Sequence, residues 1–157
     1  MTSYLIAGPG EEPVSRAEAK AFCRIDGDAE DALLDALIAA ARLHVEGLTG
    51  RALVTQTWRL VLHRPPPVVA LPVLPAVELL AAPDGAVLEG ECVRLATLPE
   101  TLTLDYVAGY GDPTAVPADL RQAVLTLVAH WFEYRDAVTV APLGFERLVA
   151  TYRRARL

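Results

Sequence analysis

The feature that most constrains the fold of this 157-residue chain is that its apolar periodicity changes twice. Residues 14–50 and 116–135 repeat apolar side chains every three to four positions, which is typical of helices. Residues 52–108 alternate in short runs that proline and glycine interrupt, which is typical of strands joined by turns. Helices, then short antiparallel strands, then helices predict the α+β class, a mainly α-helical fold into which a small sheet is inserted.

The N-terminal third is expected to begin as an extended arm over residues 1–13 and to continue as two helices. Ser15 and Glu18 have the spacing of a capping box, so a short helix should start there and end near Cys23. Asp28 is expected to cap a second helix that continues to about Leu48 and ends at Thr49-Gly50.

The middle of the chain is expected to form one antiparallel sheet of four or five strands. The prolines at 65–67 prevent the first strand from continuing as a central one. The predicted strands are 54–62, 77–80, 85–88, 92–95 and 102–107.

A third helix is predicted from Pro117 to about Tyr134, and its apolar residues lie on two sides. One stripe should face the core of the subunit. Because a helix that is apolar on two sides is usually buried on two sides, the second stripe is predicted to contact a neighbouring subunit. The residues of this predicted subunit interface are Leu125, Ala129 and Phe132.

The C-terminal segment, residues 143–157, is expected to form a short helix over 145–152 and a basic tail. The whole chain has a net charge of -6, whereas residues 137–157 contain one acid and four arginines, a net charge of +3. A basic end on an acidic protein suggests an acidic partner, either another protein or a second copy. The predicted partner contacts are Leu148, Val149, Arg153, Arg154 and Arg156.

No catalytic, cofactor or metal motif is present in the sequence. The three histidines and two cysteines are separated and form no CxxC or HExxH spacing, neither serine lies in GxSxG, and no P-loop precedes the only lysine. Cys23 and Cys92 are predicted to be buried free thiols of a cytoplasmic protein. No apolar run reaches the roughly 18 residues of a membrane helix. These observations favour a component of an assembly, and an enzyme built from Cys23, His44 and Asp26 is the weakest alternative.

Three stretches of the sequence resemble the head-tail connector (adaptor) proteins of tailed phages, in the branch found in siphophages and gene transfer agents. The stretches occur in the same order as in that family. They are residues 12–34 with EPVSRAEAK, RID and DALL, residues 49–58 with TGRALVTQTW, and residues 106–135 with YVAGYG, VPADLRQA and HWFEYR.

The resemblance implies a single connector domain over residues 1–157 that serves as a structural adaptor, without catalysis or cofactor. Such a protein forms a ring, usually of twelve subunits, between the portal and a stopper or tail-side protein in the neck of a virion or phage-like particle. The particle would be assembled in the cytoplasm of a bacterial host. The resemblance also implies that the C-terminal segment contacts the portal. The acidic body agrees with a channel through which DNA passes without binding. The alternative is a small cytoplasmic binding or regulatory module that dimerises through its second and third helices.

Overall fold

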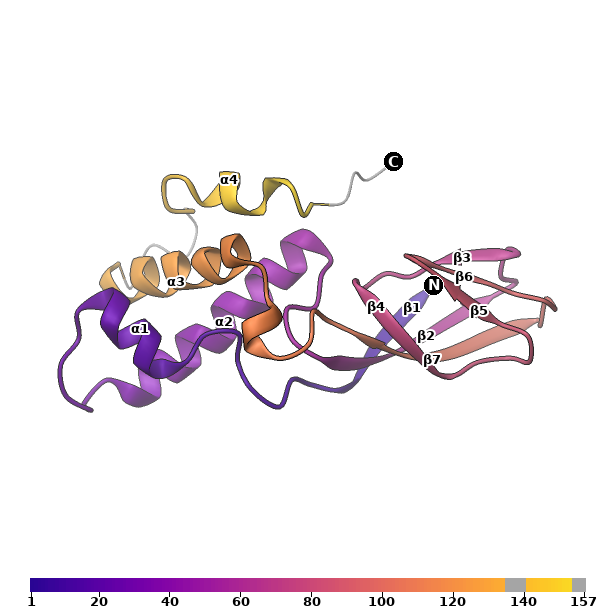
Figure 1. Cartoon of the computed structure of the whole chain (residues 1–157), viewed down its shortest axis with the longest axis horizontal. Coiled ribbons are helices and arrows are strands. Elements are labelled where there is room, and N and C mark those ends of the chain that lie inside the picture. The colour runs from indigo at the N-terminus through magenta and orange to yellow at the C-terminus, as the bar shows by residue number, and fades with distance from the viewer. Residues whose placement is uncertain (135–140, 154–157) are drawn as a thin grey trace. The chain divides into compact units, whose positions relative to one another are not determined.

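The computed structural model describes residues 1–134 and 141–153, and the chain divides into two compact units (Figure 1). The sheet unit comprises residues 1–10 and 50–111, and the helical unit comprises residues 11–49 and those that follow residue 111. The α+β class is confirmed, because separate helices and purely antiparallel sheets are both present. The segment 52–108 lies in the sheet unit, and both helical segments lie in the helical unit.

The sheet unit consists of two antiparallel sheets instead of the one that the sequence suggested. The larger sheet has the order β1-β2-β7-β4, with β1 at Thr2–Ala7, β2 at Gln56–His63, β7 at Thr101–Ala108 and β4 at Ala76–Ala81. The smaller sheet has the order β3-β6-β5, with β3 at Val68–Ala70, β6 at Cys92–Arg94 and β5 at Val87–Glu89.

The core of the sheet unit lies between the two sheets. Alternate residues of β7 are buried, and the register pairs Leu104 with Leu60 of β2 on the same face. Val69 of β3 and Val93 of β6 belong to the same buried cluster, so the smaller sheet covers this face of the larger one. The Tyr106 hydroxyl lies in this core and accepts a hydrogen bond from the backbone N–H of Val73 at 3.3 Å.

The expectation of an extended arm over residues 1–13 is wrong for its first half. Thr2–Ala7 forms the edge strand β1, which pairs with β2. The segment contains threonine, tyrosine and isoleucine and no charge, so it fits a strand, and Gly8 and Pro9 end it. The sequence prediction gave weight to the later glycines and prolines and overlooked the strand before them.

Gly109 shows why the sheet unit ends in a glycine-rich turn. Its φ is 126°, which side chains disfavour, and a Cβ at this position would collide with the carbonyl of Val54. Its backbone N–H donates to the Pro75 carbonyl at 2.9 Å. The glycine therefore permits a close approach of backbones at this turn.

The helical unit contains four α-helices and a short 3-10 turn within its described residues (Figure 1). The capping box of Ser15 and Glu18 is confirmed. The helix α2 starts at Asp31, two residues later than a cap at Asp28 predicts, and the Asp28 carboxylate pairs with Lys20 at 2.9 Å. The elements are α1 at Arg16–Cys23, α2 at Asp31–Thr49, η1 at Pro113–Ala115, α3 at Ala118–Glu133 and α4 at Phe145–Ala150.

The core of the helical unit forms where α2 packs against α3 and where α3 packs against α4. On α2 the buried stripe includes Ile38, whereas Leu48 near the end of the helix is 37% exposed. The other buried apolar side chains of this core include Val14, Ala19, Leu34, Ala41, Val45, Leu120, Val124, Leu127, Phe145 and Val149.

Candidate interaction surfaces

The predicted interface residues of α3 lie outside its buried stripe. Leu120, Ala123, Val124, Leu127 and Val128 are buried within the unit. Leu125, Ala129 and Phe132 are each partly exposed, and at 100° per residue they lie on the side of α3 roughly opposite that stripe. We call these three residues the α3 outer stripe. Its exposure leaves the stripe available to a neighbour, and the interface itself stays a prediction.

The predicted partner contacts of the C-terminal segment divide into core and surface residues. Val149 is fully buried in the core of its own unit, so it is not available to a partner, whereas Leu148 is partly exposed. Arg153 is exposed and pairs with Glu146 of α4 at 2.6 Å. Arg154 and Arg156 lie outside the described residues.

Aromatic contacts fix α4 to the rest of its unit. The ring centroid of His44, on α2, lies 5.7 Å from that of Trp131 on α3 and 6.0 Å from that of Phe145 on α4. Phe145 is fully buried. The helix that precedes the basic tail is therefore part of the folded unit, and His44 is a packing residue.

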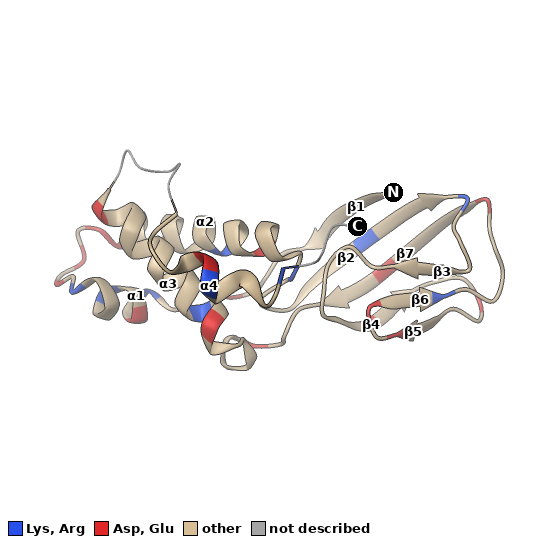
Figure 2. Cartoon of the chain, turned by 90° about the horizontal axis from the view of Figure 1, so that it is seen from above, with Lys and Arg blue, Asp and Glu red and all other residues tan. Residues whose placement is uncertain are grey.

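Ion pairs join α1 to α2, and Figure 2 marks the basic and acidic residues along the ribbon. Arg16 pairs with Asp31 at 2.9 Å and with Asp35, and Lys20 pairs with Asp31 at 2.5 Å. The hydrogen bond from Lys20, with a second from Arg16, lowers the pKa of Asp31. The hydrogen bond from Arg16 lowers the pKa of Asp35. The acidic start of α2 is therefore held to α1 by carboxylates that stay ionised at neutral pH.

A second set of polar contacts joins α1 to α3. Arg121 of α3 pairs with Glu18 and donates from Nε to the Pro13 carbonyl at 3.1 Å. The backbone N–H of Ser15 donates to Glu18 at 2.8 Å, and this bond is the main reason that the pKa of Glu18 is lowered. Glu18 therefore completes the helix cap and also binds α3.

Arg42 is a charged residue that the helical unit buries almost completely, at 7% exposure. Its Nε donates to Glu12 at 2.8 Å and its Nη1 to Glu46 at 2.9 Å. Burial lowers the pKa of Arg42, but the two carboxylates raise it by more, so the guanidinium stays charged. Arg42 fixes the segment before α1 to α2.

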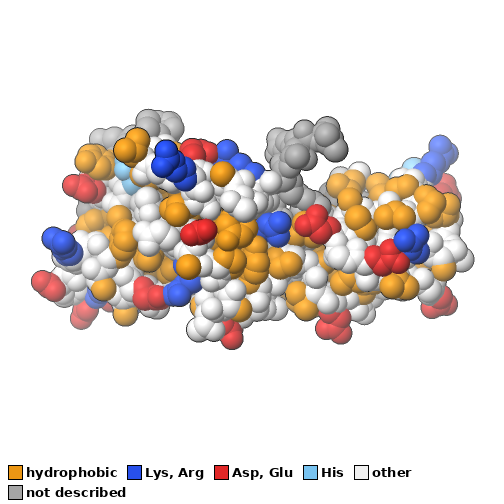
Figure 3. Space-filling model, turned by 45° about the horizontal axis from the view of Figure 1, so that its top comes forward, with side chains coloured by type: hydrophobic (Ala, Val, Ile, Leu, Met, Phe, Trp, Pro, Cys, Tyr) orange, Lys and Arg blue, Asp and Glu red, His pale blue; other side chains and the backbone are white. Residues whose placement is uncertain are grey.

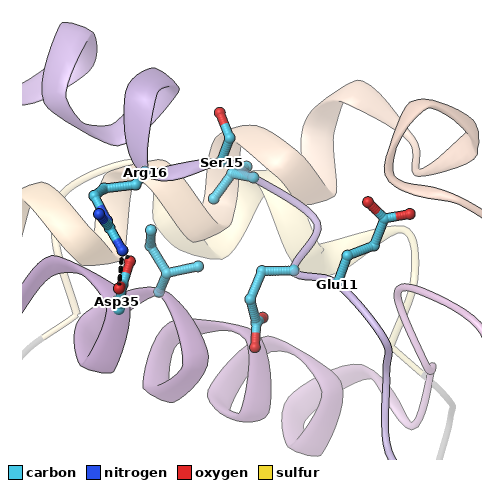
Figure 4. A pocket seen from close by; sticks show the side chains of 7 residues that line it. Glu11, Ser15, Arg16 and Asp35 are labelled. Carbon is cyan, nitrogen blue, oxygen red and sulfur yellow. Dashed lines mark hydrogen bonds and ion pairs between the residues drawn. The ribbon is translucent and has the colours of Figure 1, made fainter. Parts of the chain in front are cut away.

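A pocket of about 360 Å³ lies beside this segment (Figure 4). The Ser15 hydroxyl is bound to Glu18 at 2.9 Å, Arg16 and Asp35 pair with each other, and Glu12 pairs with Arg42. Most polar groups of this pocket are therefore engaged in holding the unit together and do not form a reactive arrangement. Its lining residues are Glu11, Glu12, Val14, Ser15, Arg16, Asp35 and Ile38.

The sequence analysis missed one exposed surface, on the side of α2 that faces away from the core. We call it the α2 outer face, and it carries no charged residue although it is exposed. The signal was present in the sequence, because an exposed helix face normally alternates charged and polar residues. The face consists of Ala32, Ala36, Ala40, Leu43 and Gly47.

Other exposed apolar side chains are spread over both units, among charged ones (Figure 3). Cys23 and Cys92 are free, as predicted, but both are partly exposed instead of buried. Within residues 1–134 and 141–153, no three His, Cys, Asp or Glu side chains converge to hold a metal ion. In the same ranges, no helix has the length and apolar character that crossing a membrane requires.

Comparisons with known proteins link the chain to the necks of phage-like particles. The model of the family described as phage gp6-like head-tail connector protein matches residues 17–89. Three solved chains cover 100% of this chain and 97% of their own length. None of the curated proteins matches significantly.

The three solved chains come from gene transfer agent particles. One, from the virion of the native particle, is 28% identical with a TM-score of 0.86. Another, from the neck of the empty particle computed with C6 symmetry, is 26% identical with a TM-score of 0.84. The third, from the neck of the native particle computed with C12 symmetry, is 26% identical with a TM-score of 0.77.

Proposed function

Because the chain belongs to the phage gp6-like head-tail connector family, we propose that it is a structural adaptor in the neck of a phage or gene transfer agent particle. It acts there as a ring of identical subunits and not as an enzyme. The observation that carries the proposal is the similarity of the whole chain, sheet unit and helical unit together, to chains of gene transfer agent particles.

The proposed ring has twelve subunits. The similarity to a neck computed with C12 symmetry supports this number, and the related neck computed with C6 symmetry is compatible with it. A ring requires two different surfaces on each subunit, because the contact is head to tail. The α3 outer stripe, with Leu125, Ala129 and Phe132, provides one of these surfaces.

The proposed partners are the portal protein on one side of the ring and a stopper or tail-side protein on the other. The arginines at 153, 154 and 156 would form bidentate pairs with carboxylates of the portal, and Leu148 would add apolar contact. DNA passes through the channel without specific binding, because the chain has a net charge of -6.

The test is the mass of the purified protein, alone and with portal rings, measured by mass photometry and electron microscopy. We expect a monomer that assembles into rings of one size, or that forms rings on the portal. A dimer that persists at every concentration and ignores the portal would overturn the proposal and favour the dimeric binding module.

A further inference from the structure

Two Asp-Gly pairs lie in exposed connections of this chain, and they differ in how firmly the structure holds them. Asp26-Gly27 lies between α1 and α2, and Asp84-Gly85 lies between β4 and β5. An aspartate that precedes glycine is prone to isomerise, because a glycine has no side chain to shield its backbone nitrogen. The two pairs share this chemistry, so their surroundings decide where it takes place.

The reaction is a rearrangement of the backbone that needs only water. The backbone nitrogen of the glycine attacks Cγ of the aspartate and forms a C–N bond. The nitrogen loses its proton and the carboxyl group loses a hydroxyl, which leave together as water, and a cyclic succinimide remains. A water molecule then breaks either the new bond, which restores aspartate, or the original peptide bond, which leaves isoaspartate. The main chain of isoaspartate runs through the former side chain and is longer by one carbon.

The Asp26-Gly27 pair is open to this reaction. Both residues are exposed, and among the residues that the structure describes the Asp26 carboxylate has no hydrogen-bond or ion-pair partner. In that part of the chain the backbone N–H of Gly27, the attacking group, makes no backbone hydrogen bond either. A Cβ at Gly27 would meet nothing within 4 Å, so no packed neighbour hinders rotation at this point.

The connection is held on either side of the pair. The backbone N–H of Ile25 donates to the Lys20 carbonyl at 3.0 Å, at the end of α1. The Asp28 carboxylate pairs with Lys20 at 2.9 Å, and the Asp28 carbonyl accepts from the N–H of Asp31 at 3.3 Å. Rotation between Asp26 and Gly27 therefore requires none of these contacts to break.

The Asp84-Gly85 pair, in contrast, forms the centre of a closed turn. The backbone N–H of Ala86 donates to the Pro83 carbonyl at 3.1 Å, which is the hydrogen bond of a four-residue β-turn. A Cβ at Gly85 would lie 2.8 Å from the Cβ of Ala96, so this turn is also packed. Closing the succinimide requires rotation of the backbone between the two residues, which would break the turn.

Other properties of the two pairs are closely matched. Both aspartates are exposed, and φ is 79° at Gly27 and 75° at Gly85. The hydrogen bond of the turn and the contact with Ala96 are therefore the features that distinguish the second pair from the first.

We propose that Asp26 is a site of spontaneous isomerisation in the folded protein and that the turn protects Asp84. The product is an isoaspartyl residue between α1 and α2, which is a substrate for carboxyl methyltransferases that recognise isoaspartate. Because the reaction needs no enzyme, the amount of product rises with the age of the protein. The proposal does not depend on the proposed role in a particle neck.

The test follows both pairs in one sample of the full chain, stored in neutral buffer at about 37 °C for several weeks. Trypsin then releases Asp26 in the peptide 25–42 and Asp84 in the peptide 60–94, since trypsin does not cleave before Pro65. Isoaspartate is located by mass spectrometry with fragmentation and is quantified by enzymatic methyl transfer to each peptide. We expect it to accumulate at Asp26 several times faster than at Asp84. Equal rates, or no product at Asp26, would overturn the proposal.

Two controls separate the effect of the structure from that of the local sequence. In concentrated urea, where both connections are unfolded, we expect the two pairs to isomerise at similar rates. Asp26→Glu should remove the product from the peptide 25–42 and leave the fold and the peptide 60–94 unchanged, because the longer side chain closes a ring less readily. A difference between the pairs that persists undiminished in urea would show that neighbouring residues set the rates, and the proposed protection by the turn would be wrong.

Discussion

At the scale of single residues, the helical unit depends on charged side chains that are paired with opposite charges and largely shielded from water. Arg42 is 7% exposed and is held between Glu12 and Glu46. Such a group is costly to remove, because the carboxylates then lose their counter-charge in a partly desolvated site. Exposed pairs such as Arg94 with Glu89 lack this property, because water and salt screen them.

We predict that Arg42→Met lowers the free energy of unfolding of the helical unit by about 2–4 kcal/mol, because removing one partner of a buried ion pair leaves the other charge uncompensated. The change is measured by urea unfolding followed by circular dichroism at 222 nm. Arg94→Met in the sheet unit is the matched control and should hardly move the transition. Equal effects of the two substitutions would contradict the role given to Arg42.

At the scale of elements, ion pairs attach α1 to both α2 and α3. Helix α1 contributes Ala19 to the buried core, and its other contacts to α2 and α3 include the pairs of Arg16, Lys20 and Glu18. The pKa values of Glu18, Asp31 and Asp35 are lowered in the folded chain. Their contribution to stability is therefore present above their ordinary values near 4 and is lost as pH falls through the lowered values.

We predict that the stability of the helical unit is constant from about pH 7 to pH 5 and falls below about pH 5, where these carboxylates begin to protonate on unfolding. Melting temperatures measured between pH 7 and pH 3 test this. The Asp31→Asn, Asp35→Asn double variant should be less stable at pH 7 and should show a shallower loss on acidification. A loss of equal steepness in the double variant would show that other groups control the acid response.

The α3 outer stripe is an element whose role in assembly can be separated from folding. We predict that Phe132→Asp leaves the helical signal in circular dichroism unchanged and stops ring formation, because Phe132 is partly exposed in the subunit. Leu127→Asp is the control for the buried side of α3 and should unfold the unit. An unfolded Phe132→Asp chain would mean that Phe132 is an ordinary core residue.

The role of the basic tail must be tested with a chain that keeps α4. Ending the chain at Gly144 would remove Phe145 and Val149 from the core, so loss of portal binding would then have two explanations. We predict instead that replacing the arginines at 153, 154 and 156 by glutamate leaves the fold intact and weakens co-purification with the portal at least tenfold, and that salt weakens the wild-type complex. Undiminished binding would place the portal contact elsewhere.

At the scale of the whole molecule, charge decides how the ring meets DNA. The chain carries 20 acidic residues against 14 lysines and arginines, so it has little capacity to release counterions from a duplex. We predict no binding of the isolated protein to double-stranded DNA at 150 mM salt, by fluorescence anisotropy. The tail peptide alone, which is basic, is the positive comparison. Micromolar binding by the full chain with a steep salt dependence would contradict a passive channel.

The sequence by itself determined the class of fold, the order of the helices and the central strands, and the family resemblance, but it missed the strands at Thr2–Ala7 and Val68–Ala70. The capping box of Ser15 and Glu18, the strand at residues 101–108 and the stripe of Leu120, Val124 and Leu127 are local patterns, in which each residue acts on neighbours within one or two turns or along one strand. The three stretches that carried the resemblance are local in the same sense.

Tertiary structure decided what depends on partners distant in sequence. Thr2–Ala7 is a strand because β2, about 50 residues later, supplies its hydrogen bonds. The second sheet exists because β6 pairs with both β3 and β5. Val149 is buried instead of available to a partner because Phe145 turns α4 onto α2 and α3. The lack of charge on the α2 outer face is readable from the sequence, but the tertiary structure decides that this face is exposed and that Asp31, Asp35, Arg42 and Glu46 pair on another side of the helix.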